Sequence, residues 1–201
     1  MSKKHAYIFG DGGHAGVIAS ELKQNLIFIV PVALSQNQVS EEFFFNSIDE
    51  RKKHDIYIGI GQNYTRYKIF NHLKKLDVTI STFISSNAYV SPDATIGEGA
   101  VLCSGSVIGA KARVGSNTIV NTLSSLDHDC FLGDHSHITA GVTIGGTVKI
   151  GKNCFFGSKT AVLPNITIGD EVYVMAGSIV TRSFEDSVMI GGNPARIMKK
   201  L

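Results

Sequence analysis

The 201-residue sequence has no tryptophan, only four prolines and only three cysteines. An odd number of cysteines cannot all pair within one chain, and Cys103, Cys130 and Cys154 form no Cys-x-x-Cys pair, so neither a disulfide framework nor a zinc ribbon is indicated. The sequence also lacks a large net charge: 19 basic and 17 acidic residues leave a net charge of +2. This balance argues against a nucleic-acid or lipid partner and favours small molecules.

Long apolar runs are missing as well. The apolar residues after Met1–His5 stop at Gly10, which is too short for the core of a signal peptide or for a membrane span. Cysteines without a disulfide pattern fit a reducing compartment. We therefore expect a soluble, cytoplasmic protein with no membrane insertion.

Glycine, by contrast, is abundant at 21 residues, and it belongs to a repeat of period six. From Ile84 to Val180 an aliphatic or aromatic residue stands at every sixth position, which gives seventeen hexads. Four places after each, from Ala88 to Ser178, the residue is small or β-branched, and only Phe184 departs from this rule. A helix does not explain a period of six, because the apolar positions would drift around its surface.

A large and a small inward position in every hexad is typical of a parallel β-helix of triangular section, in which each hexad forms one side. Seventeen hexads predict between five and six coils, and the resulting domain spans residues 84–201 with its carboxyl-terminal tail. Glycine directly follows the aliphatic position in eight hexads, where a corner requires either an unusual backbone angle or close backbone approach. These glycines are Gly97, Gly109, Gly115, Gly133, Gly145, Gly151, Gly157 and Gly169.

The first 83 residues follow a different pattern, which predicts a small α/β domain of Rossmann-like type. Expected strands cover residues 6–9, 26–34, 55–60 and 79–83, and expected helices cover residues 17–23 and 64–76, the second with Arg66 and Lys68 on its exposed side. Glycine-bearing turns follow the first and third strands, where helix N-terminal N–H groups can face a phosphate. The residues of these turns that we expect to bind substrate are Gly10, Gly12, Gly13, His14, Gly61, Gln62 and Asn63.

The second strand ends in Pro31-Val32-Ala33, with no acidic residue to hold a ribose hydroxyl. This argues against ordinary NAD binding. A cleft for another nucleotide-linked ligand remains the expectation for residues 1–83.

Polar residues on the flat sides of the predicted coils carry the chemistry. His128 is followed by Asp129, and a carboxylate beside an imidazole orients and stabilises a general base. Neighbours on a strand point in opposite directions, so contact between these two requires a bend. A zinc site is the rival interpretation, because His135 and His137 flank one residue, yet the sequence supplies no convincing third ligand.

The full length resembles the left-handed β-helix acyltransferases of the sialic acid O-acetyltransferase type, which include N-acetyltransferases of UDP-linked amino sugars used for bacillosamine. No single motif is specific, but their combination is. The motifs are Ile8-Phe9-Gly10-Asp11-Gly12-Gly13-His14-Ala15-Gly16, Gly59-Ile60-Gly61-Gln62-Asn63, the segment from Asn121-Thr122 to Asp127-His128-Asp129-Cys130, and Gly191-Gly192-Asn193-Pro194-Ala195-Arg196.

The resemblance implies a homotrimer that transfers acetyl from acetyl-CoA, as co-substrate and without a metal, to a nucleotide-linked amino sugar. It makes His128 the general base and Asp129, where many members have Glu, its partner. Asn121 contacts the acceptor group of the sugar. His137 and the backbone of Gly146 face the thioester, while Gly157, Ala176 and Pro194 border the pantetheine groove between subunits. Cys130 falls at an inward small position, which disfavours a covalent intermediate.

One departure from the family concerns the nucleotide. Members that act on UDP-sugars usually carry an Asp pair at the end of the second strand, where this chain has Pro31-Val32-Ala33. The nucleotide, the sugar and the pathway are therefore left open. O-acetylation of a sialic or related nonulosonic acid is the alternative to N-acetylation. More distant alternatives are a zinc enzyme resembling the γ-carbonic anhydrases, whose His-x4-His spacing is absent, and a non-catalytic sugar-nucleotide-binding scaffold.

Overall fold

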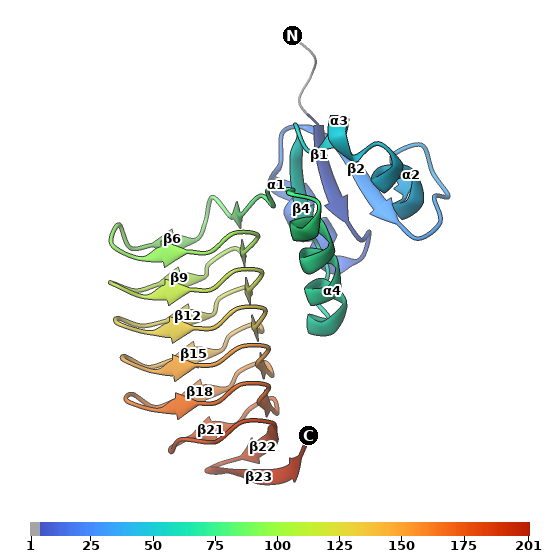
Figure 1. The fold of residues 1–201 in the computed structure, drawn as a ribbon. Helices are drawn as coiled ribbons and strands as arrows, with labels where there is room; N and C mark the ends of the chain where they lie inside the picture. Colours follow the sequence, from blue (N-terminus) through green and yellow to red (C-terminus); the bar gives the residue numbers. More distant parts are fainter. Residues whose placement is uncertain (1–4) are drawn as a thin grey trace. The chain divides into compact units, whose positions relative to one another are not determined.

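The computed structural model describes residues 5–201, which divide into two compact units, one ending at Phe83 and the other comprising Ile84–Leu201. The first unit is built on a parallel four-stranded sheet, sheet A, with strand order β3-β2-β1-β4. Strands and helices alternate as in a Rossmann-like fold. In chain order they are β1 (His5–Phe9), α1 (Gly13–Glu21), β2 (Asn25–Val30), β3 (Gln38–Ser40), α2 (Glu41–Asn46), α3 (Ile48–Arg51), β4 (Asp55–Ile58) and α4 (Asn63–Lys75) (Figure 1).

The order of the strands in sheet A decides where its ligand-facing edge lies. β1 and β4 are neighbours, with Phe9 opposite Ile58, so the turns that follow these two strands lie side by side at one edge. Apolar side chains hold the strands to the helices in a core that includes Phe44 and Leu73, both fully buried. Among residues 5–201, no helix is both long and apolar enough to cross a membrane.

The predicted strand over residues 79–83 is wrong. Residues 79–82 have no regular secondary structure, and Phe83 instead begins the first short strand of the repeat. Ser81 binds both backbone groups of Ile56: its N–H donates to the carbonyl at 2.7 Å, and its hydroxyl accepts from the N–H at 3.3 Å. The second bond is accepted by a side chain and not by backbone, so residues 79–82 do not pair with β4 as a strand of the sheet would.

The second unit is a parallel β-helix with seventeen two-residue strands, which form the predicted five to six coils (Figure 1). They are β5 (Phe83–Ile84), β6 (Tyr89–Val90), β7 (Thr95–Ile96), β8 (Val101–Leu102), β9 (Val107–Ile108), β10 (Arg113–Val114), β11 (Ile119–Val120), β12 (Ser125–Leu126), β13 (Phe131–Leu132), β14 (His137–Ile138), β15 (Thr143–Ile144), β16 (Lys149–Ile150), β17 (Phe155–Phe156), β18 (Ala161–Val162), β19 (Thr167–Ile168), β20 (Tyr173–Val174) and β21 (Ile179–Val180).

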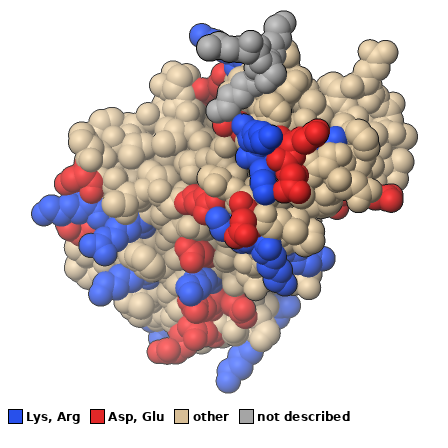
Figure 2. Space-filling model, turned by 45° about the horizontal axis from the view of Figure 1, so that its top comes forward, with Lys and Arg blue, Asp and Glu red and all other residues tan. Residues whose placement is uncertain are grey.

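Every third strand joins the same sheet, so the unit has three flat faces. Sheet B contains β5, β8, β11, β14, β17 and β20, sheet C contains β6, β9, β12, β15, β18 and β21, and sheet D contains β7, β10, β13, β16 and β19. Sheet B is extended by β22 (Val188–Gly192), which pairs with β20, and by β23 (Ala195–Lys200), which is antiparallel to β22. Basic and acidic side chains are interspersed on the surface shown in Figure 2, in keeping with the small net charge.

The second residue of each strand points inward, and the first points outward. From Leu102 to Val180 every aliphatic position of the repeat is buried, and so is every small position from Ala100 to Ser178. Ile84, at the start of the stack, is exposed. The inward pattern predicted by the sequence is thus confirmed for all but the first coil.

The corner glycines are explained by close approach rather than by backbone angle. A Cβ on Gly133 would lie 2.5 Å from the carbonyl carbon of Gly151, and one on Gly157 would lie 2.3 Å from the nitrogen of Ala176. Positive φ angles occur two residues further on, and mostly at residues other than glycine, such as Lys111 and Asn117. Turns of adjacent coils are therefore in backbone contact at the corners.

Candidate active site

His128 and Asp129 lie at the corner between sheets C and D. Nδ1 of His128 is 2.9 Å from Oδ2 of Asp129, and their side chains are 57% and 49% exposed. The predicted bend is present: Asp129 has a φ of +56°, which turns its carboxylate back toward the preceding imidazole. Because Asp129 accepts a hydrogen bond at Nδ1, the neutral ring carries its proton there and leaves the Nε2 lone pair available as a base.

Electrostatics at this corner favour the protonated imidazole. The hydrogen bond that His128 donates to Asp129 raises the pKa of His128 above its usual value of 6.5, and the charge of Asp127 raises it further. Asp127 also fixes the backbone, since its Oδ1 accepts the His128 N–H at 2.7 Å. The ring is thus an oriented base with increased basicity, which suits proton abstraction near neutral pH.

Gly146 lies beneath the imidazole in the next coil. A Cβ added at Gly146 would be 2.5 Å from Nε2 and 2.7 Å from Cε1 of His128, so the ring rests against bare backbone. The coils are linked here by the Thr147 N–H, which donates to the His128 carbonyl at 2.9 Å. Within residues 5–201 the N–H of Gly146 donates to no protein acceptor, which leaves it available beside the imidazole.

We expect Gly146→Ala to lower kcat by roughly ten-fold or more, because its methyl group forces Nε2 out of position. The clash falls on the end of an exposed side chain rather than on backbone, so the melting temperature should hardly change. Gly141→Ala is the control for kcat, since a Cβ there meets only Lys159 Cγ at 3.6 Å, while its φ of +68° lets it lower the melting temperature. Steady-state kinetics and thermal melts of both variants check this expectation, and wild-type kcat in Gly146→Ala would contradict it.

Asn121 and His137 lie together at a different corner, between sheets B and C. Asn121 Nδ2 is 3.5 Å from Nε2 of His137, and the Asn121 Oδ1 accepts the Thr122 N–H at 2.7 Å. His137 is 4% exposed and its ring packs edge-on against Phe155, with centroids 5.4 Å apart. Within one chain, the whole of sheet C separates this pair from His128.

The other predicted acetyl-CoA residues follow the same B–C corner toward the carboxyl terminus. Gly157 lies below Asn121 along the stack and packs on the backbone of Ala176. Pro194 is exposed in the turn between β22 and β23, preceded by a cis peptide bond. This corner therefore carries Gly157 and Ala176 below Asn121, beside the exposed Met175.

The predicted substrate residues of the first unit gather at the edge of sheet A. Gly10 directly follows β1 and has a φ of +90°. Gly12 is the N-cap of α1 and Gly13 is its first residue, and a Cβ added to either would meet no atom within 4 Å. Gly61 lies against His14, because a Cβ there would be 2.5 Å from the His14 ring. Burial and then the charge of Arg66 lower the pKa of His14, so its ring is neutral at this edge.

Gln62 is the N-cap of α4 and Asn63 is its first residue. The side chains of both bond to the first turn of this helix. The Gln62 Oε1 caps the helix by accepting the Thr65 N–H at 2.6 Å. Asn63 Oδ1 accepts from the Arg66 guanidinium at 3.0 Å. These side chains shape the turn, which lies against His14 through Gly61.

Arg66 corrects the expectation of an exposed side chain. It is 0% exposed, and its Nη1 donates to the carbonyls of Ile60 and Gly61, each at 3.1 Å. Burial lowers its pKa to about 9. The helical pattern placed it with the lysines, but its bonds to the preceding turn draw the side chain inward. Arg66 is thus a positioning residue for the Gly61–Asn63 turn, which sequence reasoning missed.

The histidines proposed for zinc do not converge. His135 is in a corner with a φ of +63° and lies 2.8 Å from Asn117 Nδ2, whereas His137 begins β14. Across residues 5–201, no three His, Cys, Asp or Glu side chains group as metal ligands. Cys130 is buried as predicted, its thiol donates to the Gly145 carbonyl at 3.1 Å, and burial raises its pKa.

Comparison with known proteins gives matches to this fold. A model of the hexapeptide repeat of succinyl-transferase matches residues 147–182. The acetyltransferase domain of PglB from Neisseria gonorrhoeae, solved with acetyl coenzyme A, is 27% identical with a TM-score of 0.90, over 98% of this chain and 100% of that one. A histidine-to-alanine mutant of GDP-perosamine N-acetyl transferase from Caulobacter crescentus, solved with CoA and GDP-perosamine, is 29% identical with a TM-score of 0.89, over 98% and 97%.

These findings confirm the predicted fold, a Rossmann-like unit followed by a left-handed parallel β-helix. Residues 147–182 match the hexapeptide repeat found in acyltransferases. Over nearly its full length the chain is similar to acetyltransferases, one of them solved with a nucleotide-linked sugar.

Proposed function

We propose that this protein is an acetyl-CoA-dependent N-acetyltransferase that acts on the amino group of a nucleotide-linked amino-deoxy sugar for surface glycan biosynthesis. The observation that carries the proposal is the His128–Asp129 pair, at 2.9 Å, with its imidazole resting on Gly146. The two full-length matches described above are acetyltransferases solved with acetyl coenzyme A or with CoA and GDP-perosamine. No nucleic-acid partner is part of this proposal.

The mechanism is direct transfer. His128 Nε2 removes a proton from the acceptor amine as the amine nitrogen attacks the thioester carbonyl, and Asp129 stabilises the resulting imidazolium through Nδ1. The N–H of Gly146 would donate to the oxyanion, where each such donor strongly stabilises a transition state. When the carbon–sulfur bond breaks, the proton on His128 can pass to the departing thiolate. Cys130 takes no part, since it is buried.

We further propose that the active site is shared between copies of the chain in a homotrimer. The outward ladder of sheet C carries no charge: it is Tyr89, Val107, Ser125, Thr143, Ala161 and Ile179. Three copies packed through this face would bring His128 of one copy toward Asn121 and His137 of the next, which one chain keeps apart. Sedimentation equilibrium tests this step, and a monomer at assay concentration would contradict it.

The assignments of the other residues follow from this arrangement. His137, Gly157, Ala176 and Pro194 would border acetyl-CoA at the B–C corner, and Asn121 would contact the acceptor. The turns at Gly10–His14 and Gly61–Asn63 would bind the nucleotide-linked sugar at the edge of sheet A. A cytoplasmic location is part of the proposal, and three buried cysteines that form no disulfide within residues 5–201 are compatible with it.

The test is release of coenzyme A from acetyl-CoA, followed with a thiol reagent, against UDP-, GDP- and dTDP-linked amino sugars and free and CMP-linked sialic acids. We expect turnover with one amino sugar, above the background measured without acceptor. Turnover with sialic acids alone would replace N-acetylation by O-acetylation. If no acceptor of the panel supports release of coenzyme A although acetyl-CoA still binds, the proposed acceptor class is contradicted.

A further inference from the structure

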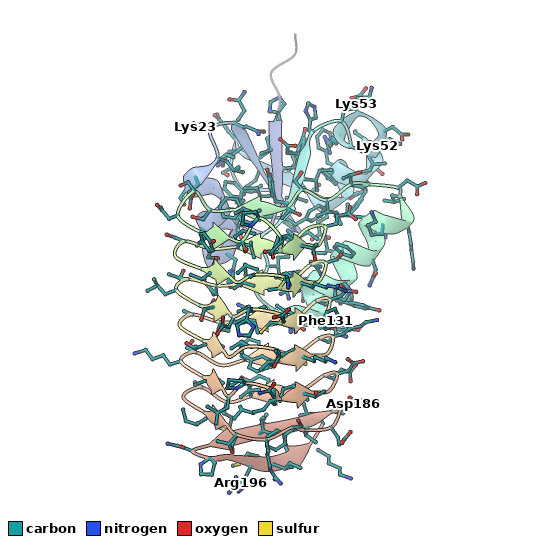
Figure 3. All side chains as sticks on the ribbon, turned by 90° about the vertical axis from the view of Figure 1, so that its left-hand side faces the viewer. Lys23, Lys52, Lys53, Phe131, Asp186 and Arg196 are labelled. Atoms are coloured by element: carbon teal, nitrogen blue, oxygen red, sulfur yellow. The ribbon has the colours of Figure 1, made fainter. Side chains whose placement is uncertain are left out.

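Sheet D carries a basic ladder beside the His128–Asp129 pair that the mechanism above does not use. Arg113, Phe131 and Lys149 are the outward residues of β10, β13 and β16, and they lie in register on consecutive coils. They line a depression of about 510 Å³ together with Asp93, Thr95, Lys111, Asp129 and Cys130. Phe131, 46% exposed, lies midway along the stack (Figure 3).

The carboxylates of this depression already accept hydrogen bonds from neighbouring groups of the protein. Asp93 accepts from the Ser91 hydroxyl at 2.6 Å and from the Lys111 N–H at 3.2 Å, while Asp129 is bonded to His128. Arg113 and Lys149 make no side-chain hydrogen bond or ion pair with any of residues 5–201. Two unpaired cations therefore flank an exposed aromatic ring, an arrangement complementary to a small polyanion.

The location of these cations decides which polyanion they fit. Phe131 follows His128 by three residues, a reach of at most about 10 Å, and Arg113 and Lys149 are each one strand spacing away, about 4.8 Å. A sugar nucleotide carries its diphosphate on the sugar ring itself, within this range of the reacting amine. In acetyl-CoA, the long pantetheine arm places the diphosphate much further from the thioester.

We propose that Arg113 and Lys149 bind the diphosphate of the nucleotide-linked acceptor across Phe131, an inference that rests on the proposed function. The two cations are about 10 Å apart along the ladder, and both side chains are long enough to converge above Phe131. Recognition of the diphosphate is independent of the base, so this subsite contributes equally for uridine, guanosine and thymidine nucleotides. It complements the first unit, where β2 ends without acidic residues to hold a ribose.

The experiment compares Arg113→Gln, Lys149→Gln and the double variant with Lys152→Gln. Lys152 is an exposed lysine in the corner turn that follows β16, and it does not line the depression. Each single variant should raise the KM for the nucleotide-linked acceptor about ten-fold, the value of one charge-assisted contact. We expect the KM for acetyl-CoA, the melting temperature and the kinetics of Lys152→Gln to match wild type.

Other outcomes separate this inference from the proposed function. An unchanged acceptor KM in the double variant, or a raised KM for acetyl-CoA alone, would overturn the diphosphate subsite while leaving the reaction in place. Wild-type protein that is inactive with every acceptor would contradict the function instead. In that case, calorimetric titration with inorganic pyrophosphate still decides the subsite: weaker binding in the double variant than in Lys152→Gln supports it, and equal binding refutes it.

Discussion

Replacing His128 by alanine is expected to lower kcat by roughly a hundred-fold or more, because the amine then loses its general base. The fold should survive, since the side chain is more than half exposed and its hydrogen-bond partner Asp129 lies on the same corner. The measurement is coenzyme A release with the acceptor identified by the panel, at saturating concentrations of both substrates, beside a thermal melt. Wild-type kcat in a folded His128→Ala protein would exclude the proposed mechanism.

The pH profile identifies the base more sharply than the loss of rate alone. His128 acts only when neutral, so kcat/KM should rise with pH through a midpoint above 6.5, in the direction that Asp129 shifts the pKa. The matched variant is Asp129→Asn, which keeps the size of the side chain but removes its charge. That change should move the rising limb to lower pH, whereas His128→Ala should abolish the limb. If kcat/KM of His128→Ala still rises with pH in the same way, the ionisation belongs to a group other than His128, and the assignment of His128 as the base is wrong.

Much of the fold was predictable from the sequence because each hexad repeats the same two inward positions. Ile108, Val114 and Val120, for example, are buried as the period of six requires. The bend that joins His128 to Asp129 was predicted only as a condition, since its positive φ falls on Asp129, and few residues other than glycine adopt such an angle. Local pattern therefore indicated the candidate pair but not the backbone that joins it.

Features that depend on contacts between distant residues were not predictable. The helical period placed Arg66 among exposed lysines, and only the carbonyls of Ile60 and Gly61 account for its burial. In the same way, residues that are 18 apart, such as Arg113 and Phe131, become neighbours only once the coil is closed. The basic ladder on sheet D is invisible as a sequence motif for this reason.

For glycines at the corners the sequence left two explanations open, an unusual backbone angle and close backbone approach. The structure distinguishes these two explanations. At Gly133 a Cβ would lie 2.5 Å and 2.6 Å from the carbonyl carbon and oxygen of Gly151. At Gly141 the φ is +68°, but the nearest atom to a Cβ is Lys159 Cγ, at 3.6 Å. One glycine is required by the neighbouring backbone and the other by its own conformation, so alanine at each position should have a different cost.

Gly133→Ala is therefore expected to destabilise the protein by about 3 kcal/mol, because the methyl group meets backbone that cannot move without separating two coils. The Gly133 N–H donates to the Ile150 carbonyl at 2.8 Å, and this bond would be strained by the same separation. Gly141→Ala should cost only about 1 kcal/mol, the penalty for a left-handed alanine. Urea unfolding at a fixed protein concentration measures both. Since each coil is stabilised by its neighbours, a mid-stack separation should also broaden the Gly133→Ala transition. Equal costs, or a larger cost at Gly141, would show that backbone angle rather than close approach governs these corners.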